Sequence, residues 1–135
     1  MMMDQTMDYP VIDDELARRL ERAEGTASAR FVEARARLQP DSGALWIDVA
    51  GTYAMFDGAD SPLSQTFGLG LFQPAAAETL AAIEAFFRER GAPVCHEVSP
   101  LADPALLTLL PDRGYRPVEF TSVMFRPVGR DARLG

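Results

Sequence analysis

The residues best suited to chemistry are three neighbours, Cys95, His96 and Glu97, in a short segment with strand character. Side chains alternate between the faces of a strand, so Cys95 and His96 point apart and cannot form a nucleophile–base pair. Glu97 shares the face of Cys95 and could act as the base for an amine, or it could be an ordinary solvated edge carboxylate. The single histidine lacks partners of metal-ligand spacing, so we expect no metal.

Two further polar residues could contact a ligand. Tyr115 could donate a proton or a hydrogen bond, although a ring packed under a short helix with its hydroxyl in solvent is the alternative. Ser99 stands beside Pro100 at a predicted strand end, where turn chemistry also accounts for it.

A strand followed directly by a helix, over residues 64–91, positions these groups. The strand is predicted over residues 64–72, which are rich in aliphatic, aromatic and β-branched side chains. Pro74 suits the first position of a helix, because its missing N–H would have had no partner there. Gly91 suits a left-handed cap at the helix end. The apolar face of this helix is predicted to be Leu80, Ile83, Phe86 and Phe87.

The segment before it predicts helices and a hairpin. Asp13 and Asp14 offer an N-cap to a helix over residues 15–24, and a second helical segment covers residues 27–38. Gly25 and Thr26 between them leave two helices or one kinked helix open. The apolar stripe of the first segment is predicted to be Leu16, Leu20 and Ala23.

Strand patterns predict a mixed sheet. Residues 44–49, 52–56 and 64–72 predict three consecutive antiparallel strands, and residues 93–98 predict a strand parallel to the third, with the helix as crossover. Asp103 and Pro104 indicate the start of a short helix that Pro111 and Gly114 end. A last strand is predicted over residues 116–128, with a bend near Thr121 and Ser122.

Length and charge limit the class of protein. The 135 residues suit one domain over residues 13–128, between a flexible start at residues 1–12 and a tail at residues 129–135. A net charge of −7 argues against nucleic acid or an anionic membrane as the main partner. One cysteine excludes an internal disulfide, and the start has no signal-peptide pattern, so we expect a cytoplasmic protein.

The order of elements and several local motifs resemble the GNAT superfamily of N-acetyltransferases. The likeness spans about residues 16–128 and is to the amino-terminal half of two-domain GNAT proteins, which continue into a second acetyltransferase domain. The resemblance implies an α/β (α+β) fold with a mostly antiparallel sheet, flanked by helices, whose strands four and five are parallel and splayed. The motifs that carry it are residues 68–71, 86–91, 99–103 and Arg113-Gly114-Tyr115.

This resemblance implies acetyl-CoA as cofactor, with its pyrophosphate at backbone N–H groups where strand four meets the next helix. The corresponding residues here are Leu69, Leu71, Phe72, Gln73, Ala75 and Ala76. The family pattern R/Q-x-x-G-x-G/A is altered, because no basic residue is present and Pro74 removes an N–H donor. The tyrosine that commonly protonates the thiolate leaving group is replaced by Leu110, and the family's asparagine by Asp103, which we interpret as a helix cap.

Three functions of different classes follow. The first is a catalytically degenerate GNAT-like module that provides an interface or substrate wall to another acetyltransferase domain, either an identical copy in a homodimer or a separate chain. The second is an active N-acetyltransferase of a small amine or amino-acid-like metabolite, with Glu97 or water as base and Tyr115 as acid. The third is a ligand-binding or dimerisation domain unrelated to acyl-CoA. Fold resemblance alone supplies no catalytic residue, so we favour the first.

Overall fold

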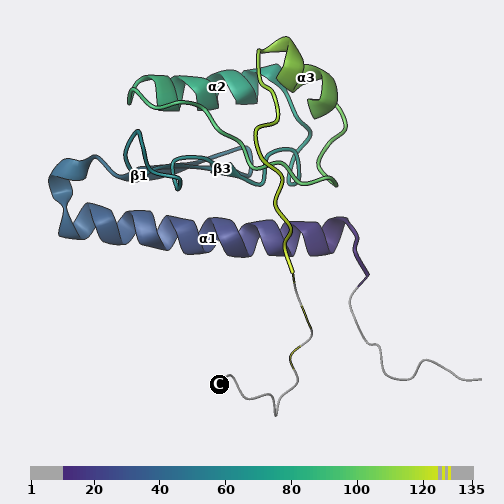
Figure 1. Cartoon of the computed structure of the whole chain (residues 1–135), viewed down its shortest axis with the longest axis horizontal. Coiled ribbons are helices and arrows are strands. Elements are labelled where there is room, and N and C mark those ends of the chain that lie inside the picture. Colours follow the sequence, from purple (N-terminus) through teal and green to yellow (C-terminus); the bar gives the residue numbers. More distant parts are fainter. Residues whose placement is uncertain (1–10, 125, 127, 129–135) are drawn as a thin grey trace, which may run out of the picture.

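The structure is a computed structural model that describes residues 11–124, 126 and 128. Its described part has a mixed α+β fold, with three α-helices and a small three-stranded antiparallel sheet. Helix α1 (Asp14–Leu38) lies along one side of the sheet, and helices α2 (Ala77–Arg88) and α3 (Leu106–Asp112) lie on the other (Figure 1). The predictions for residues 1–10 and for the tail at 129–135 lie outside the described residues.

Helix α1 is one continuous helix rather than two. The Asp13 carboxylate caps it by accepting a hydrogen bond from the Leu16 N–H at 2.9 Å, as predicted. The helix continues through Gly25. The missing side chain of this glycine lets α1 approach the sheet closely, since a Cβ there would lie 3.2 Å from Tyr53 Cδ2 and 3.3 Å from Phe67 Cβ. The predicted stripe was wrong at Ala23, which is exposed. The buried positions of α1 are Leu16, Ala17, Glu21, Gly25, Ala29 and Val32.

The predicted antiparallel arrangement of three strands is confirmed. After a short 3-10 turn (Pro40–Ser42), β1 (Leu45–Val49) pairs with β2 (Thr52–Phe56), and β2 pairs with β3 (Thr66–Phe67). Ala50 and Gly51 connect β1 to β2 with φ of 52° and 85°, the two positive values that a type I′ hairpin turn needs.

The third strand is much shorter than the predicted range of residues 64–72. Gly68 and Gly70 have φ of 88° and 73°, and the Leu71 N–H donates to the Gly68 carbonyl at 3.1 Å, so the chain turns after Phe67. The prediction that Pro74 opens the next helix was also wrong, because α2 begins at Ala77. Gly91 has the predicted left-handed conformation, with φ of 66°.

The parallel strand predicted over residues 93–98 is reduced to one parallel bridge, between Thr66 and His96. Residues 116–124 form no strand either, and they make no backbone–backbone hydrogen bond within the described chain. Pro117 lacks a donor, and strand propensity alone does not hold an unpaired segment. Residues 125 and 127 of the predicted last strand lie outside the described chain. Helix α3 contains Pro111, which we predicted to end it.

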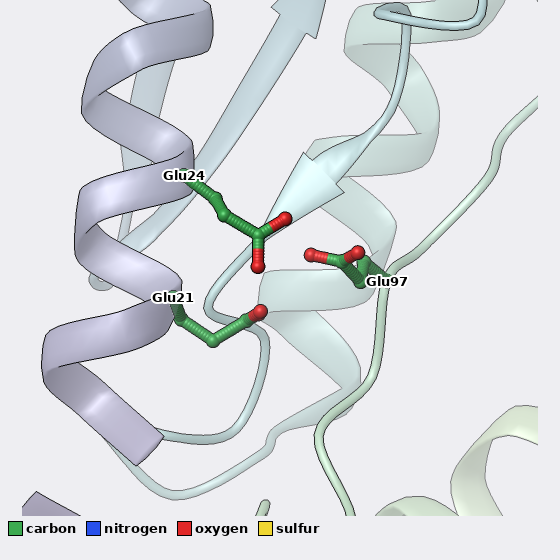
Figure 2. A group of neighbouring side chains, drawn as sticks. All are labelled: Glu21, Glu24 and Glu97. Atoms are coloured by element: carbon green, nitrogen blue, oxygen red, sulfur yellow. The ribbon is translucent and has the colours of Figure 1, made fainter. Parts of the chain in front are cut away.

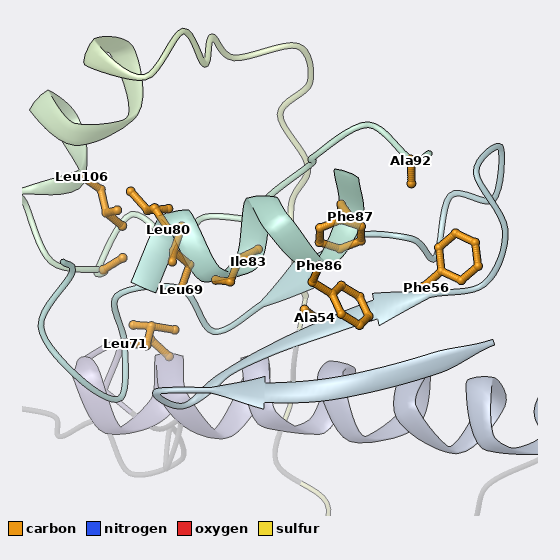
Figure 3. Packing of buried hydrophobic residues seen from close by; sticks show 12 residues of the cluster. Ala54, Phe56, Leu69, Leu71, Leu80, Ile83, Phe86, Phe87, Ala92 and Leu106 are labelled. Atoms are coloured by element: carbon orange, nitrogen blue, oxygen red, sulfur yellow. The ribbon is translucent and has the colours of Figure 1, made fainter. Parts of the chain in front are cut away.

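Apolar side chains pack on both faces of the sheet. On the α1 face, Val32, Met55 and Phe67 are buried, beside Trp46 and Tyr53, whose ring centroids lie 4.7 Å apart. On the opposite face, α2 forms the larger cluster (Figure 3). Its fully or almost fully buried members include Ala54, Leu69, Leu80, Ile83 and Phe87. No helix in the described chain is both long and apolar enough to cross a membrane.

Candidate functional site

The candidate site lies where the backbone pairing between β3 and the segment carrying His96 ends. Thr66 forms both hydrogen bonds of the parallel bridge: its N–H donates to Cys95 O at 3.0 Å, and its carbonyl accepts from the Glu97 N–H at 3.2 Å. The next donor of a parallel ladder would be the Gly68 N–H. It donates instead to Glu21 Oε1 at 2.9 Å. The side chain of Glu21, from α1, therefore takes the place of further strand pairing.

Three glutamates meet at this point. Glu21 and Glu24 are three residues apart on α1, a spacing that puts both side chains on one face of a helix. Figure 2 shows both reaching toward Glu97, and one carboxylate oxygen from each of the three lies within 4.8 Å of the others. Glu24 Oε1 and Glu97 Oε2 are buried and have no hydrogen-bond partner among the described residues.

Burial and mutual repulsion favour the protonated form of these carboxyls. Burial raises the pKa of Glu97 to about 7, and the neighbouring carboxylate of Glu21 acts in the same direction. The pKa of Glu24 is also raised, first by burial and then by the charge of Glu97. Burial raises the pKa of Glu21, while the Gly68 N–H opposes the shift. A group with a pKa near 7 can both accept and donate a proton at neutral pH.

Glu97 is therefore not the solvated edge carboxylate that we gave as its alternative interpretation. Its two neighbours, Cys95 and His96, differ from each other in exposure. Cys95 is exposed, whereas the ring of His96 lies inside, with Nδ1 2.8 Å from the Thr66 hydroxyl. Burial lowers the pKa of His96 to about 4, so its imidazole is neutral at physiological pH. The opposite directions of Cys95 and His96 agree with the predicted strand geometry.

Tyr115 does not join the glutamate cluster. Its hydroxyl donates a hydrogen bond to Glu84 Oε2 at 2.9 Å, and the Arg113 Nε donates to the same oxygen at 3.0 Å. Burial, and then its contact with Glu84, raises the pKa of Tyr115 well above its usual range. The ring contacts His96, with 4.9 Å between centroids. The hydroxyl therefore has Glu84 as a protein partner, and the structure separates the two proposed catalytic residues, Glu97 and Tyr115, into different hydrogen-bond networks.

The predicted cofactor residues divide into buried and exposed groups. Leu69 and Leu71 are 1% and 7% exposed and belong to the core, while Phe72 is half-buried with its ring 3.8 Å from the Arg22 guanidinium carbon. Gln73 is exposed, and Ala75 and Ala76 precede α2. An open depression of about 260 Å³ is lined by Gly70, Leu71, Phe72, Gln73, Pro74 and Asp103.

In that depression, the Asp103 carboxylate accepts hydrogen bonds from two backbone N–H groups. Its Oδ2 accepts a hydrogen bond from the Ala75 N–H at 2.8 Å, and its Oδ1 accepts one from the Ala105 N–H at 3.0 Å. These bonds lower the pKa of Asp103, so the carboxylate is ionised at neutral pH. The predicted capping role holds in part, since Asp103 stabilises the turn before α3 while Ala105 is the N-cap residue.

The sequence interpretation missed Glu21 and Glu24. The available signal was the spacing of small residues at Ala17, Gly25 and Ala29, which places Glu21 on the buried stripe of α1. Three carboxylates at this separation could also hold a hard cation. The prediction of no metal was made from histidine and cysteine spacing and stays a prediction.

Comparisons with known proteins returned no match, whether to a family model, to the curated proteins or to the solved structures.

Proposed function

We propose that this chain is a GNAT-like domain that has lost catalysis and acts as an interface or substrate-binding module of an N-acetyltransferase. The order of elements supports the proposal: a helical segment, three antiparallel strands, a helix, a segment that meets β3 in a parallel bridge, and a short helix. The parallel pairing is limited to that one bridge, and in a GNAT fold strands four and five would diverge at this point.

The observation that carries the loss of catalysis is the hydrogen-bonding of Asp103. A pyrophosphate at the start of α2 would need free backbone N–H groups and a favourable field. The Ala75 N–H already donates to the Asp103 carboxylate, and Pro74 has no N–H. An ionised carboxylate at this place repels a phosphate as well as competing for its donor.

The missing acid supports the same conclusion. Leu110, at the place of the family's tyrosine, packs against the core cluster and cannot donate a proton. The nearest candidate substitute in the sequence, Tyr115, has its hydroxyl engaged with Glu84. Loss of a general acid typically lowers a rate by about 10²- to 10⁴-fold.

An interface role is supported by apolar side chains in the segment after Tyr115. Val118, Phe120 and Met124 are 89%, 90% and 91% exposed, and each is two or four residues from the next. In an extended chain such side chains share one face. A second acetyltransferase domain or a second copy of this chain would cover them.

Calorimetric titration of the purified chain with acetyl-CoA and with free CoA tests the loss of catalysis. We expect no heat of binding up to millimolar ligand and no CoA release with a panel of primary amines. An Asp103→Ala variant frees the Ala75 N–H and removes the repelling charge, so it should bind free CoA more tightly than wild type does. Saturable binding or turnover above background by the wild-type chain would refute the proposal.

One observation favours a second candidate, an active N-acetyltransferase of a small amine or amino-acid-like metabolite. Glu97 has a pKa of about 7 beside the point where β3 and its neighbour diverge, which suits the base that removes a proton from an ammonium group. An active enzyme would bind acetyl-CoA and lose activity in Glu97→Gln, with a rate that rises through about pH 7. Absence of acetyl-CoA binding eliminates this candidate.

A further inference from the structure

The contact between α1 and the segment at His96 and Glu97, called the joint below, includes three glutamate side chains, Glu21, Glu24 and Glu97. On α1, Glu21 is only 8% exposed, and Glu24 lies one turn further along the same face. Glu97 meets both from the other side of the joint (Figure 2). Three negative charges so close together and partly buried would drive the two elements apart.

Among the described residues, no cation acts on Glu97 itself, although the charge of Arg22 lowers the pKa of Glu21. From α1 Glu97 is faced by Glu21 and Glu24, and Arg22 on that helix instead donates to the Gly51 carbonyl at 3.1 Å and stacks on Tyr53 and Phe72. Directly after β3, the Gly68 N–H donates its hydrogen bond to Glu21.

His96 is on the same segment and is neutral above about pH 4. It is the ring of His96, rather than Glu97, that lies against Tyr115 and is influenced by Glu84 of α2. Neither His96 nor Tyr115 therefore supplies a positive charge to the glutamate cluster at physiological pH.

We propose that one proton, held between Glu21 and Glu97, fastens the segment around Glu97 to α1, and that its loss on going to mildly alkaline pH loosens this joint. The proton converts two repelling carboxylates into a hydrogen-bonded pair, with Glu21 anchored by Gly68. The inference does not depend on whether the domain binds acetyl-CoA.

The direction of the pH effect follows from the raised pKa of Glu97. The folded state keeps its proton up to about pH 7, whereas the unfolded state releases it near pH 4.5. The stabilisation is complete below about pH 4.5 and is lost as the pH rises to about 7. Within that window the folding equilibrium constant should fall by up to about tenfold per pH unit, on the order of 100-fold in total.

The experiment compares the full chain with Glu97→Gln and with Glu119→Gln, an exposed glutamate in the segment without secondary structure. Urea unfolding is measured between pH 5 and 8.5. Relative to wild type, Glu97→Gln should gain stability as the pH rises, by on the order of 100-fold in equilibrium constant. Glu119→Gln should run parallel to wild type.

A second measurement keeps the proposal testable even if Glu97→Gln fails to fold. The side-chain carboxyl ¹³C resonance of Glu97 in wild type should titrate near neutrality, and Glu21→Gln should move its midpoint downward by a unit or more. Amide exchange at Gly68, corrected for its intrinsic pH dependence, should accelerate above the midpoint. A Glu97 midpoint between 4 and 5, or parallel unfolding curves for wild type and a folded Glu97→Gln, would overturn the proposal.

Discussion

Two partly buried glutamate sites in this domain behave in opposite ways. Glu84, on α2, accepts hydrogen bonds from the Arg113 guanidinium and the Tyr115 hydroxyl, and its pKa is lowered, first by Arg113. Glu97 faces only other carboxylates among its charged partners, and its pKa is raised. The first site is ionised at neutral pH, whereas Glu97 is only about half ionised there.

The difference shows that burial alone does not decide the charge of a carboxyl. Both groups lose water, which favours the neutral form, but a guanidinium and a phenol offer Glu84 donors that compensate. Glu97 has no such donor in the described chain, and Glu21 has the Gly68 N–H. The Glu84 site should therefore gain stability with rising pH, whereas the Glu97 site loses it.

The largest effect on the Glu97 site should come from Gly25→Leu, because the new side chain would push α1 away from β3. The new side chain would collide with Tyr53 and Phe67, so we expect a loss of about 3 kcal/mol in the free energy of unfolding. The carboxylates of α1 would also retreat from Glu97, and its titration midpoint should fall. Ala27→Leu on the exposed side of α1 is the control. Equal stability of the two variants would contradict the close approach.

Arg113→Ala should make Glu84 resemble Glu97. Without the guanidinium, a partly buried carboxylate keeps only the Tyr115 hydroxyl, so we expect a lower free energy of unfolding at pH 7 and a raised pKa for Glu84. Chemical denaturation at pH 5 and 7 measures it, and the loss should shrink at pH 5. The control is Arg116→Ala, an exposed arginine nearby. A loss independent of pH would argue for a packing effect instead.

Tyr115→Phe tests the hydrogen bond from the Tyr115 hydroxyl to Glu84, which we expect to contribute less than the Arg113 guanidinium does. Removing one hydrogen bond to a charged acceptor should cost about 1–1.5 kcal/mol and leave the fold intact. Tyr53→Phe removes a hydroxyl that donates to no described residue and should cost less, by the same thermal or chemical unfolding measurement. Equal effects would mean that the Tyr115 hydroxyl contributes nothing to the network.

Glu24→Gln should have the smallest effect and the opposite sign. It removes one repelling charge from the Glu97 site, but solvent screens a half-exposed carboxylate, so we expect a gain of at most about 0.5 kcal/mol at pH 8 and almost none at pH 5. Unfolding curves at the two pH values give the difference. Destabilisation at pH 8 would show that Glu24 is needed as an anion, for example by a bound cation.

Local patterns in the sequence predicted the elements that depend on near neighbours. The Asp13 cap, the β1–β2 hairpin, the three antiparallel strands and the left-handed Gly91 all follow from turn chemistry and alternation, and the structure confirms them. The lengths of β3 and of the segment at His96 did not follow, because the Gly68 N–H bonds to a glutamate 47 residues away instead of to a neighbouring strand.

The sequence by itself determined a helical segment, three antiparallel strands and then two further helices in a small acidic chain, because periodicity and caps act over a few residues. Only the tertiary structure decided which carboxyls carry charge. Sequence reasoning singled out Glu97 but not Glu21 or Glu24, and the three carboxyls come together only when α1 packs against the end of β3. Electrostatic energy depends on distance and burial, which only the folded chain defines.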